Sequence, residues 1–219
     1  MKQFVIIGLG NFGYYLAASL YEKGHEVLAI DINPKPVQAI RDHVSQAVIA
    51  DATEKKTLEQ LGIKDMDAAV LCIGSNMEAS ILSMLNIKDI GVQQIIAKAI
   101  SEPHSRILYS IGATRIIFPE KDTAISLSER LINPNIMDYL PFLEGYSIIE
   151  WAPPSKFIGK SLQELNLINR YGTQVIAIKS LVPEQIQMIP KAGFIIKDSD
   201  ILILLGPNDG IGKLNRENK

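Results

Sequence analysis

Three glycines near the N-terminus constrain this chain more than any other feature. Gly8, Gly10 and Gly13 follow an apolar run at residues 4–7 and precede a helical apolar pattern at residues 15–20. The glycines therefore lie where a strand turns into a helix, which is the context of a dinucleotide-binding loop. In such a loop the first glycine allows the tight turn, the second lets the backbone approach a pyrophosphate, and the third lets the helix lie close to the strand. The N–H groups of the first helical turn then face the phosphates.

A carboxylate follows at the spacing that this loop requires. A second apolar run, residues 26–30, ends at Asp31, close to the roughly 20-residue separation expected for an acidic residue that binds a ribose. A glycine pattern alone is weak evidence. Together, the loop and the carboxylate predict an adenine nucleotide as the ligand.

Strand-like and helix-like segments alternate as far as Pro119. The predicted strands are residues 4–7, 26–30, 46–50, 68–73, 94–99 and 115–118, and the predicted helices are 12–23, 34–43, 54–61, 76–90 and 103–111. This order predicts an α/β fold, with a Rossmann-like doubly wound parallel sheet in residues 1–119. Ligands bind at the carboxyl ends of the strands in such sheets. The candidate residues are therefore those that close each strand: Gly8, Gly10, Asn11, Phe12, Gly13, Asp31, Ile32, Asn33, Asp51, Ala52, Thr53, Ile73, Gly74, Ser75, Asn76, Lys98, Ala99, Ile100, Pro119 and Glu120.

Structural roles compete with ligand contact at several of these positions. Asp51 and Asn76 precede helices and could each be an N-cap, a role that can coexist with ligand contact. Lys98 could be a solvated strand end, and His104 an ordinary residue at a helix start. Cys72 stands alone in an apolar run, so we expect a core residue rather than a reactive thiol.

The pattern changes after Glu120. Residues 121–132 carry a helical apolar stripe, and a second apolar segment, residues 136–142, follows a break at residues 133–135. An apolar helix that leaves a finished sheet must be covered, either by the chain's own second domain or by a partner subunit, and the length of the segment favours a partner. Residues 145–219 predict a small α+β domain, with strands at 147–151, 174–179 and 200–205, a short helix at 161–165 and a proline-flanked hairpin region.

Composition argues against several classes of function. The 22 basic and 24 acidic residues are spread evenly, which gives no basic surface for nucleic acid. No apolar run approaches the ~20 residues of a membrane span, and a single cysteine indicates a reducing cytoplasm. Residues 146–219 contain no histidine, cysteine or clustered carboxylates that could serve hydride transfer as acid or base. We therefore expect a ligand sensor and not an enzyme; the alternative is a small NAD(H)-dependent oxidoreductase or an NAD-sensing protein.

Two ordered sets of motifs resemble one protein family. The N-terminal set, VIIGLGNFG, AIDIN, IADATE, LCIGSN, AKA and GATRIIFPEKD, resembles the nucleotide-binding domain of the cytosolic regulators of potassium conductance, the gating subunits of bacterial Ktr and Trk potassium uptake systems. The C-terminal set, IGKSLQELNL, RYGTQVIAIK and IKDSDILILLG, is similar to the C-terminal regulatory domain of that family. The resemblance covers nearly the whole chain.

The resemblance implies a regulatory role on a membrane. Homodimers would assemble into an octameric ring that docks on the cytoplasmic face of a membrane-embedded potassium translocating subunit and changes shape with bound ATP or ADP. Asp31 would hold the ribose, and the pocket would be lined by Asp51, Ala52, Ile73, Gly74, Ser75, Lys98, Ala99, Ile100 and His104. Glu120 matches a carboxylate that in close relatives helps hold a divalent cation, Mg²⁺ or Ca²⁺, near the phosphates between subunits. Residues 120–144 would be the crossover helices that pair two subunits.

The sequence departs from the family at two positions. Asn11 stands where close relatives carry an arginine that reaches the terminal phosphate of ATP. Because a charge-assisted hydrogen bond contributes about 1.5 to 3 kcal/mol, its loss would remove most discrimination of ATP over ADP unless Lys98 or a basic residue of a neighbouring subunit compensates. The change also leaves NAD(H) and AMP as alternative ligands. In some relatives the C-terminal domain binds cyclic di-AMP at a dimer interface, but here Ile168 occupies the position of an arginine.

Overall fold

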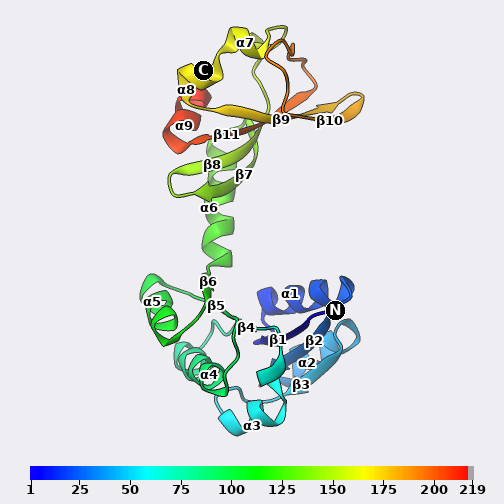
Figure 1. Ribbon diagram of the computed structural model, residues 1–219, viewed down its shortest axis with the longest axis vertical. Helices are drawn as coiled ribbons and strands as arrows, with labels where there is room; N and C mark the ends of the chain where they lie inside the picture. The colour runs from blue at the N-terminus through cyan, green and yellow to red at the C-terminus, as the bar shows by residue number, and fades with distance from the viewer. Residues whose placement is uncertain (217–219) are drawn as a thin grey trace. The chain divides into compact units, whose positions relative to one another are not determined.

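The computed structural model describes residues 1–216, and its contacts divide the chain into two compact units, Met1–Pro119 and Glu120–Lys219. Among the described residues, no helix combines the length and apolar character needed to span a bilayer. Each unit has its own sheet and its own core (Figure 1).

The first unit is a six-stranded parallel sheet with the strand order β3-β2-β1-β4-β5-β6. The strands are β1 (Gln3–Ile7), β2 (Glu26–Asp31), β3 (Gln46–Ile49), β4 (Ala68–Leu71), β5 (Ile95–Lys98) and β6 (Arg115–Ile117). The helices are α1 (Asn11–Glu22), α2 (Pro34–Ile40), α3 (Lys55–Gln60), α4 (Met77–Ile90) and α5 (Glu102–Ile111). The predicted doubly wound parallel sheet is therefore confirmed.

Alternation along β1 shows why helices cover both faces of this sheet. Val5 and Ile7 belong to a core that includes residues of α3, α4 and α5, whereas Ile6 belongs to a second core with residues of α1 and α2. Successive side chains of a strand point to opposite faces, so a strand that is apolar throughout must be buried on both. The order of the strands reverses between β1 and β4, which places the topological switch point beside the glycine loop.

The second unit contains a five-stranded antiparallel sheet with the order β10-β9-β11-β8-β7. Its strands are β7 (Ile136–Leu143), β8 (Tyr146–Trp151), β9 (Gln174–Leu181), β10 (Glu184–Met188) and β11 (Asp200–Pro207). Its helices are α6 (Pro119–Ile132), α7 (Leu162–Leu165), α8 (Leu167–Tyr171) and α9 (Asn208–Arg216), of which α6 begins at the last residue of the first unit. The predicted α+β architecture is confirmed, and β10 pairs with β9 in the predicted hairpin region, although the sequence analysis missed α8 and α9.

The assignment of residues 120–144 to crossover helices is wrong for its second half. Residues 136–143 form the edge strand β7, which pairs with β8 through two register shifts. Pro141 lies at one of these shifts, as expected for a proline in an edge strand. Only α6 in this segment is helical, and none of its described residues is buried within the chain.

A tryptophan organises the core of the second unit. Trp151 is fully buried, and its ring meets that of Phe157 edge to face at a centroid distance of 5.4 Å. Its indole Nε1 donates a hydrogen bond to Oδ1 of Asn215 on α9 at 2.9 Å. This bond and the burial of Ile211 and Leu214 attach α9 to the sheet.

Candidate nucleotide-binding site

The loop between β1 and α1 has the backbone geometry of a phosphate-binding turn. Gly8 has φ of +95°, a region that favours glycine, and a Cβ there would lie 2.9 Å from the Ile73 backbone nitrogen. A Cβ on Gly13 would lie 1.9 Å from the Gly8 carbonyl oxygen, so the start of α1 can approach β1 only without a side chain. Gly10 differs from both because no heavy atom lies within 4 Å of the position of its Cβ. The open side of the loop is therefore at Gly10.

The N-terminus of α1 is available to an anion. Gly10 is its N-cap and supplies no side-chain cap, and the first turn of this helix contains no acidic residue. Since the first N–H groups of a helix have no partner within the helix, they bind anions readily. The first helical residue is Asn11, which is exposed and uncharged. The first turn of α1 can therefore offer backbone N–H groups and the side-chain amide of Asn11 to a phosphate, but it has no charged side chain.

Asp31 ties the glycine loop to the neighbouring strand. One carboxylate oxygen accepts a hydrogen bond from the Leu9 backbone N–H at 2.6 Å, and the other accepts one from Asn33 N–H at 2.8 Å. An ionised carboxylate has about four acceptor sites, so each oxygen can accept a further bond. Asn33 caps α2 by accepting from Lys35 N–H at 3.0 Å, and Ile32 between them is 66% exposed. This edge presents one half-buried carboxylate and one apolar surface.

The two predicted N-caps have different outcomes. Asn76 caps α4, because its Oδ1 accepts from Ala79 N–H at 3.0 Å. Asp51 is not an N-cap, since Glu54 is the N-cap of α3 and the Asp51 carboxylate instead accepts from the N–H and the hydroxyl of Thr53, at 2.9 and 2.7 Å.

A residue that the sequence analysis missed fixes this loop from α4. The Asn86 side-chain Nδ2 donates to the backbone carbonyls of Ala52 and Thr53, at 3.1 and 2.8 Å. Ala52 itself is buried. Asp51 and Asn86 therefore hold the loop after β3 in a fixed shape.

Lys98 brings a positive charge to the loop after β4. A Cβ on Gly74 would lie 3.6 Å from Lys98 Nζ and 3.4 Å from Ile100 Cγ2.

Burial raises the pKa of the Cys72 thiol to about 12, and the nearby Lys98 ammonium opposes that rise only in part. Cys72 is buried, as expected for a core residue. Ser75 and Ala99 follow β4 and β5 at the same edge of the parallel sheet.

His104 lies beneath the loop that follows β5. It is fully buried in the first turn of α5, and its Nδ1 accepts from Ile100 N–H at 3.4 Å. Its Nε2 has no hydrogen-bond partner among the described residues. Burial lowers the pKa of this imidazole, which keeps it neutral at pH 7 with its proton on Nε2. His104 thus supports Ile100, which is itself 47% exposed.

Glu120 is the residue that we expect to help hold a divalent cation. Glu120 and Asp122 lie in the first turn of α6, and within residues 1–216 no three His, Cys, Asp or Glu side chains are grouped as metal ligands. A cation held by Glu120 would therefore need further ligands, such as nucleotide phosphates.

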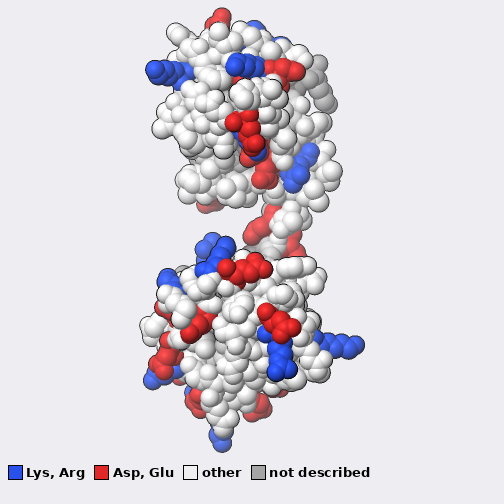
Figure 2. All heavy atoms as spheres, turned by 90° about the vertical axis from the view of Figure 1, so that its right-hand side faces the viewer, with Lys and Arg blue, Asp and Glu red and all other residues white. Residues whose placement is uncertain are grey.

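On the face in Figure 2, basic and acidic side chains are interspersed without a continuous basic surface.

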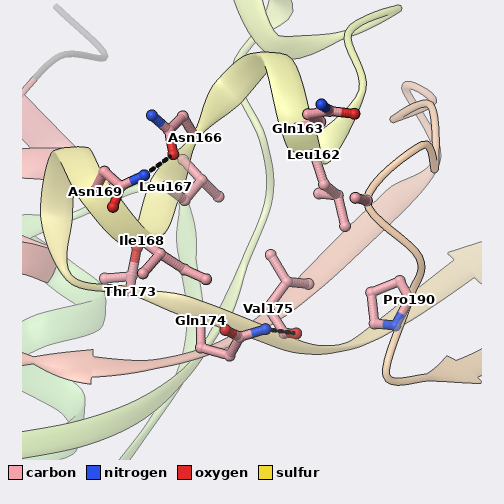
Figure 3. A pocket seen from close by; sticks show the side chains of 11 residues that line it. Leu162, Gln163, Asn166, Leu167, Ile168, Asn169, Thr173, Gln174, Val175 and Pro190 are labelled. Carbon is pink, nitrogen blue, oxygen red and sulfur yellow. Dashed lines mark hydrogen bonds between the residues drawn. The ribbon is translucent and has the colours of Figure 1, made fainter.

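The second unit contains a pocket of its own, which we call the C-terminal pocket (Figure 3). Its volume is about 410 Å³, and it lies between the α7–α8 segment, the start of β9 and the loop after β10. Its lining residues are Leu162, Gln163, Asn166, Leu167, Ile168, Asn169, Thr173, Gln174, Val175, Pro190 and Ala192. The lining includes Ile168, which stands where relatives that bind cyclic di-AMP carry an arginine.

Comparisons with known proteins agree on both units. The TrkA-N domain family matches residues 4–119, and the TrkA-C domain family matches residues 147–218. The Ktr system potassium uptake protein A of Bacillus subtilis is 38% identical over 216 residues, which cover 99% of this chain and 96% of that protein.

Solved structures show the same fold. The GsuK channel aligns with a TM-score of 0.66 at 17% identity, over 97% of this chain and 38% of that one. At this identity the likeness shows the fold alone. GsuK bound to ADP is 28% identical with a TM-score of 0.52, over 61% of this chain and 34% of that one.

Proposed function

The chain belongs to the TrkA family, with a TrkA-N domain followed by a TrkA-C domain, and on this premise we propose that it is the regulatory subunit of a Ktr- or Trk-type potassium uptake system. Its ligand is an adenine nucleotide, bound at the carboxyl edge of the first sheet. The bound nucleotide changes the conformation of an assembly and is not consumed. The observation that carries this proposal is the open, uncapped loop at Gly10 beside the carboxylate of Asp31.

The nucleotide would be held mainly by the backbone. N–H groups of the first turn of α1 bind the phosphates at Gly10, and Asp31 binds the ribose with the acceptor sites that Leu9 and Asn33 leave open. The exposed side chains of Ile32 and Ile100 would flank the adenosine. Lys98, close to Gly74, supplies the positive charge that Asn11 lacks. ATP and ADP fit this site, and NAD(H) and AMP share the adenosine and the phosphate that it contacts.

A sensor requires different contacts with its alternative ligands. A ligand that binds two conformations equally well shifts no equilibrium between them. With Asn11 uncharged, discrimination of ATP from ADP would depend on Lys98, on a divalent cation held by Glu120, or on a second subunit. We therefore expect a smaller ATP-over-ADP preference than an arginine at position 11 would give.

The assembly would be built on the apolar surface of α6 and β7. Leu131 and Ile132 on α6 are 75% and 72% exposed, and Leu140 and Leu143 on β7 are 58% and 65% exposed. Apolar side chains gathered on two consecutive elements are typical of a surface that a partner covers. We assign this surface to a homodimer of the chain, from which an octameric ring forms. The ring would lie in the cytoplasm, peripheral to the membrane and against the potassium translocating subunit.

The experiment that tests this function combines binding, assembly and transport. Thermal shift with ADP, ATP, AMP, NAD and NADH should show that adenine nucleotides stabilise the protein. Light scattering should show that the protein is an oligomer. The same chain should restore potassium uptake to cells that hold a Ktr membrane subunit but lack its regulator. A monomer that NADH alone stabilises, or turnover of that coenzyme, would instead support the oxidoreductase alternative.

A further inference from the structure

The loop after β3 is held by one side chain of α4. The amide nitrogen of Asn86 donates to the carbonyl of Ala52 at 3.1 Å and to that of Thr53 at 2.8 Å, which uses both of its N–H groups. No backbone N–H within residues 1–216 donates to either carbonyl. Because Ala52 is buried and Asn86 is half-buried, loss of this amide would leave carbonyl groups without partners where water reaches them poorly.

Asn86 can fix the loop because α4 itself is fixed. Met84 and Ile87 on this helix are fully buried in the core of the first unit, and α4 contacts α3, α5, β4 and β5. The loop after β3 therefore takes its position from a helix anchored in the core, more than thirty residues away in the sequence.

This loop carries a carboxylate with one oxygen to spare. Asp51 Oδ1 accepts from the N–H and the hydroxyl of Thr53, at 2.9 and 2.7 Å, whereas Asp51 Oδ2 has no hydrogen-bond partner among residues 1–216. Thr53 is also one of the two residues whose carbonyls Asn86 holds. Asn86 therefore fixes the direction of the Asp51 carboxylate through Thr53, and Oδ2 is an oriented acceptor.

The order of the strands indicates which part of a nucleotide would meet Asp51. Strands β1, β2 and β3 are successive neighbours in the sheet, and the Ala50 N–H donates to the Asp31 carbonyl at 3.0 Å. The loop after β3 thus lies beside the end of β2, about one strand spacing of 4.8 Å away. With the phosphates after β1 and the ribose at Asp31, the base would reach the loop after β3. The 6-amino group of adenine is a donor, for which a carboxylate oxygen is the matching acceptor.

We propose that Asn86 is a positioning residue for recognition of the base. By holding the loop after β3, it aims the Asp51 carboxylate at the 6-amino group of adenine, and it does so without touching the nucleotide. A group that is already ordered binds more tightly than one that must be ordered during binding. This inference rests on the proposed function, because it takes the phosphates at Gly10 and the ribose at Asp31 as its starting point.

The wild-type protein tests recognition of the base without any substitution. Calorimetry compares ADP with purine riboside 5′-diphosphate, which lacks only the 6-amino group. The analogue should bind roughly tenfold or more weakly, because it leaves the Asp51 carboxylate without its donor. Equal affinities would overturn the inference and leave the proposed function standing. No binding of ADP, ATP, AMP, NAD or NADH would overturn both.

Two variants at position 86 test the positioning role. Asn86→Leu removes the donors at similar size, and Asn86→Asp keeps the shape but replaces the donors by acceptors. Each should weaken ADP binding roughly tenfold or more and change binding of the analogue by less than about threefold, so that the preference for ADP disappears. Gln93→Leu is the matched control, since it removes a bond from a side-chain amide to the Gly91 carbonyl, ahead of β5 and at the opposite edge of the sheet. It should change neither affinity.

The ratio of the two affinities separates positioning from a merely structural role. General loosening of the first unit would weaken both nucleotides alike, whereas a misplaced Asp51 affects only the nucleotide that carries the amino group. Melting temperatures of the same samples show whether each variant is folded. A folded variant at position 86 that keeps the wild-type ratio, or that loses both affinities equally, would overturn the role of Asn86 and leave the proposed function intact.

Discussion

Replacing Gly10 by alanine should abolish tight nucleotide binding without unfolding the protein. The backbone of Gly10 has φ of −63° and ψ of −178°, which alanine adopts without strain, and its Cβ would meet no heavy atom within 4 Å. Alanine is a poorer N-cap than glycine but restricts the unfolded chain, so the two effects partly cancel. We expect the free energy of unfolding to change by less than about 1 kcal/mol, which is at most about 2–4 °C in Tm.

The loss of binding can be estimated from the space that the new methyl group fills. That space is where the phosphates would approach the N–H groups of α1. A hydrogen bond to a charged group contributes about 1.5–3 kcal/mol. Displacing the phosphates from one such N–H should raise the Kd for ADP roughly 10- to 150-fold.

Calorimetric titration of ADP into wild type and variant, with Tm measured on the same samples, gives both quantities. Gly193→Ala is the matched control, because Gly193 also has open space at its Cβ position and lies in the second unit. It should change neither quantity. Unchanged ADP affinity in Gly10→Ala would refute the assignment of the phosphates to this loop, and an unfolded variant would refute the steric reasoning.

Three further predictions address stability and assembly. Gly13→Ala should lower the free energy of unfolding by about 3 kcal/mol or more, because its Cβ would lie 1.9 Å from the Gly8 carbonyl oxygen; a Tm within 2 °C of wild type would contradict this. Burial holds the pKa of His104 below its ordinary value, so the unfolded chain binds a proton that the folded chain excludes, and stability should fall as the pH decreases below about 6.5. His104→Gln should flatten that dependence in urea titrations between pH 5 and 7. Leu131→Asp should shift the protein toward monomer in light scattering, whereas the same change at exposed Tyr109 should not.

The first unit could be predicted closely because its signals are local. Each strand is short, apolar and followed by a turn residue, and the glycine loop constrains its own backbone through Gly8 and Gly13. Because all six strands are parallel, their carboxyl ends lie at one edge of the sheet, and the switch point places the binding crevice at that edge. The positions of Asp31 and Lys98 at this edge follow from topology alone.

The remaining features depend on contacts between distant residues. The apolar run at residues 136–142 has the composition of a buried helix as much as of a strand, and only its pairing with β8 decides the matter. The bonds from Asn86 to the loop after β3 span more than thirty residues, so no pattern in the sequence reveals them. Helix α9 contains two glycines, of which Gly210 is required because a Cβ would lie 1.9 Å from the Tyr171 carbonyl oxygen.

Trp151 gives this protein an internal optical probe. It is the only tryptophan of the chain, and it is completely enclosed in the second unit. Its emission should be blue-shifted when that unit is folded and move to the red when it opens, while circular dichroism follows both units at once. A change of this emission upon addition of ADP would then be a direct optical signal of communication from one half of the molecule to the other.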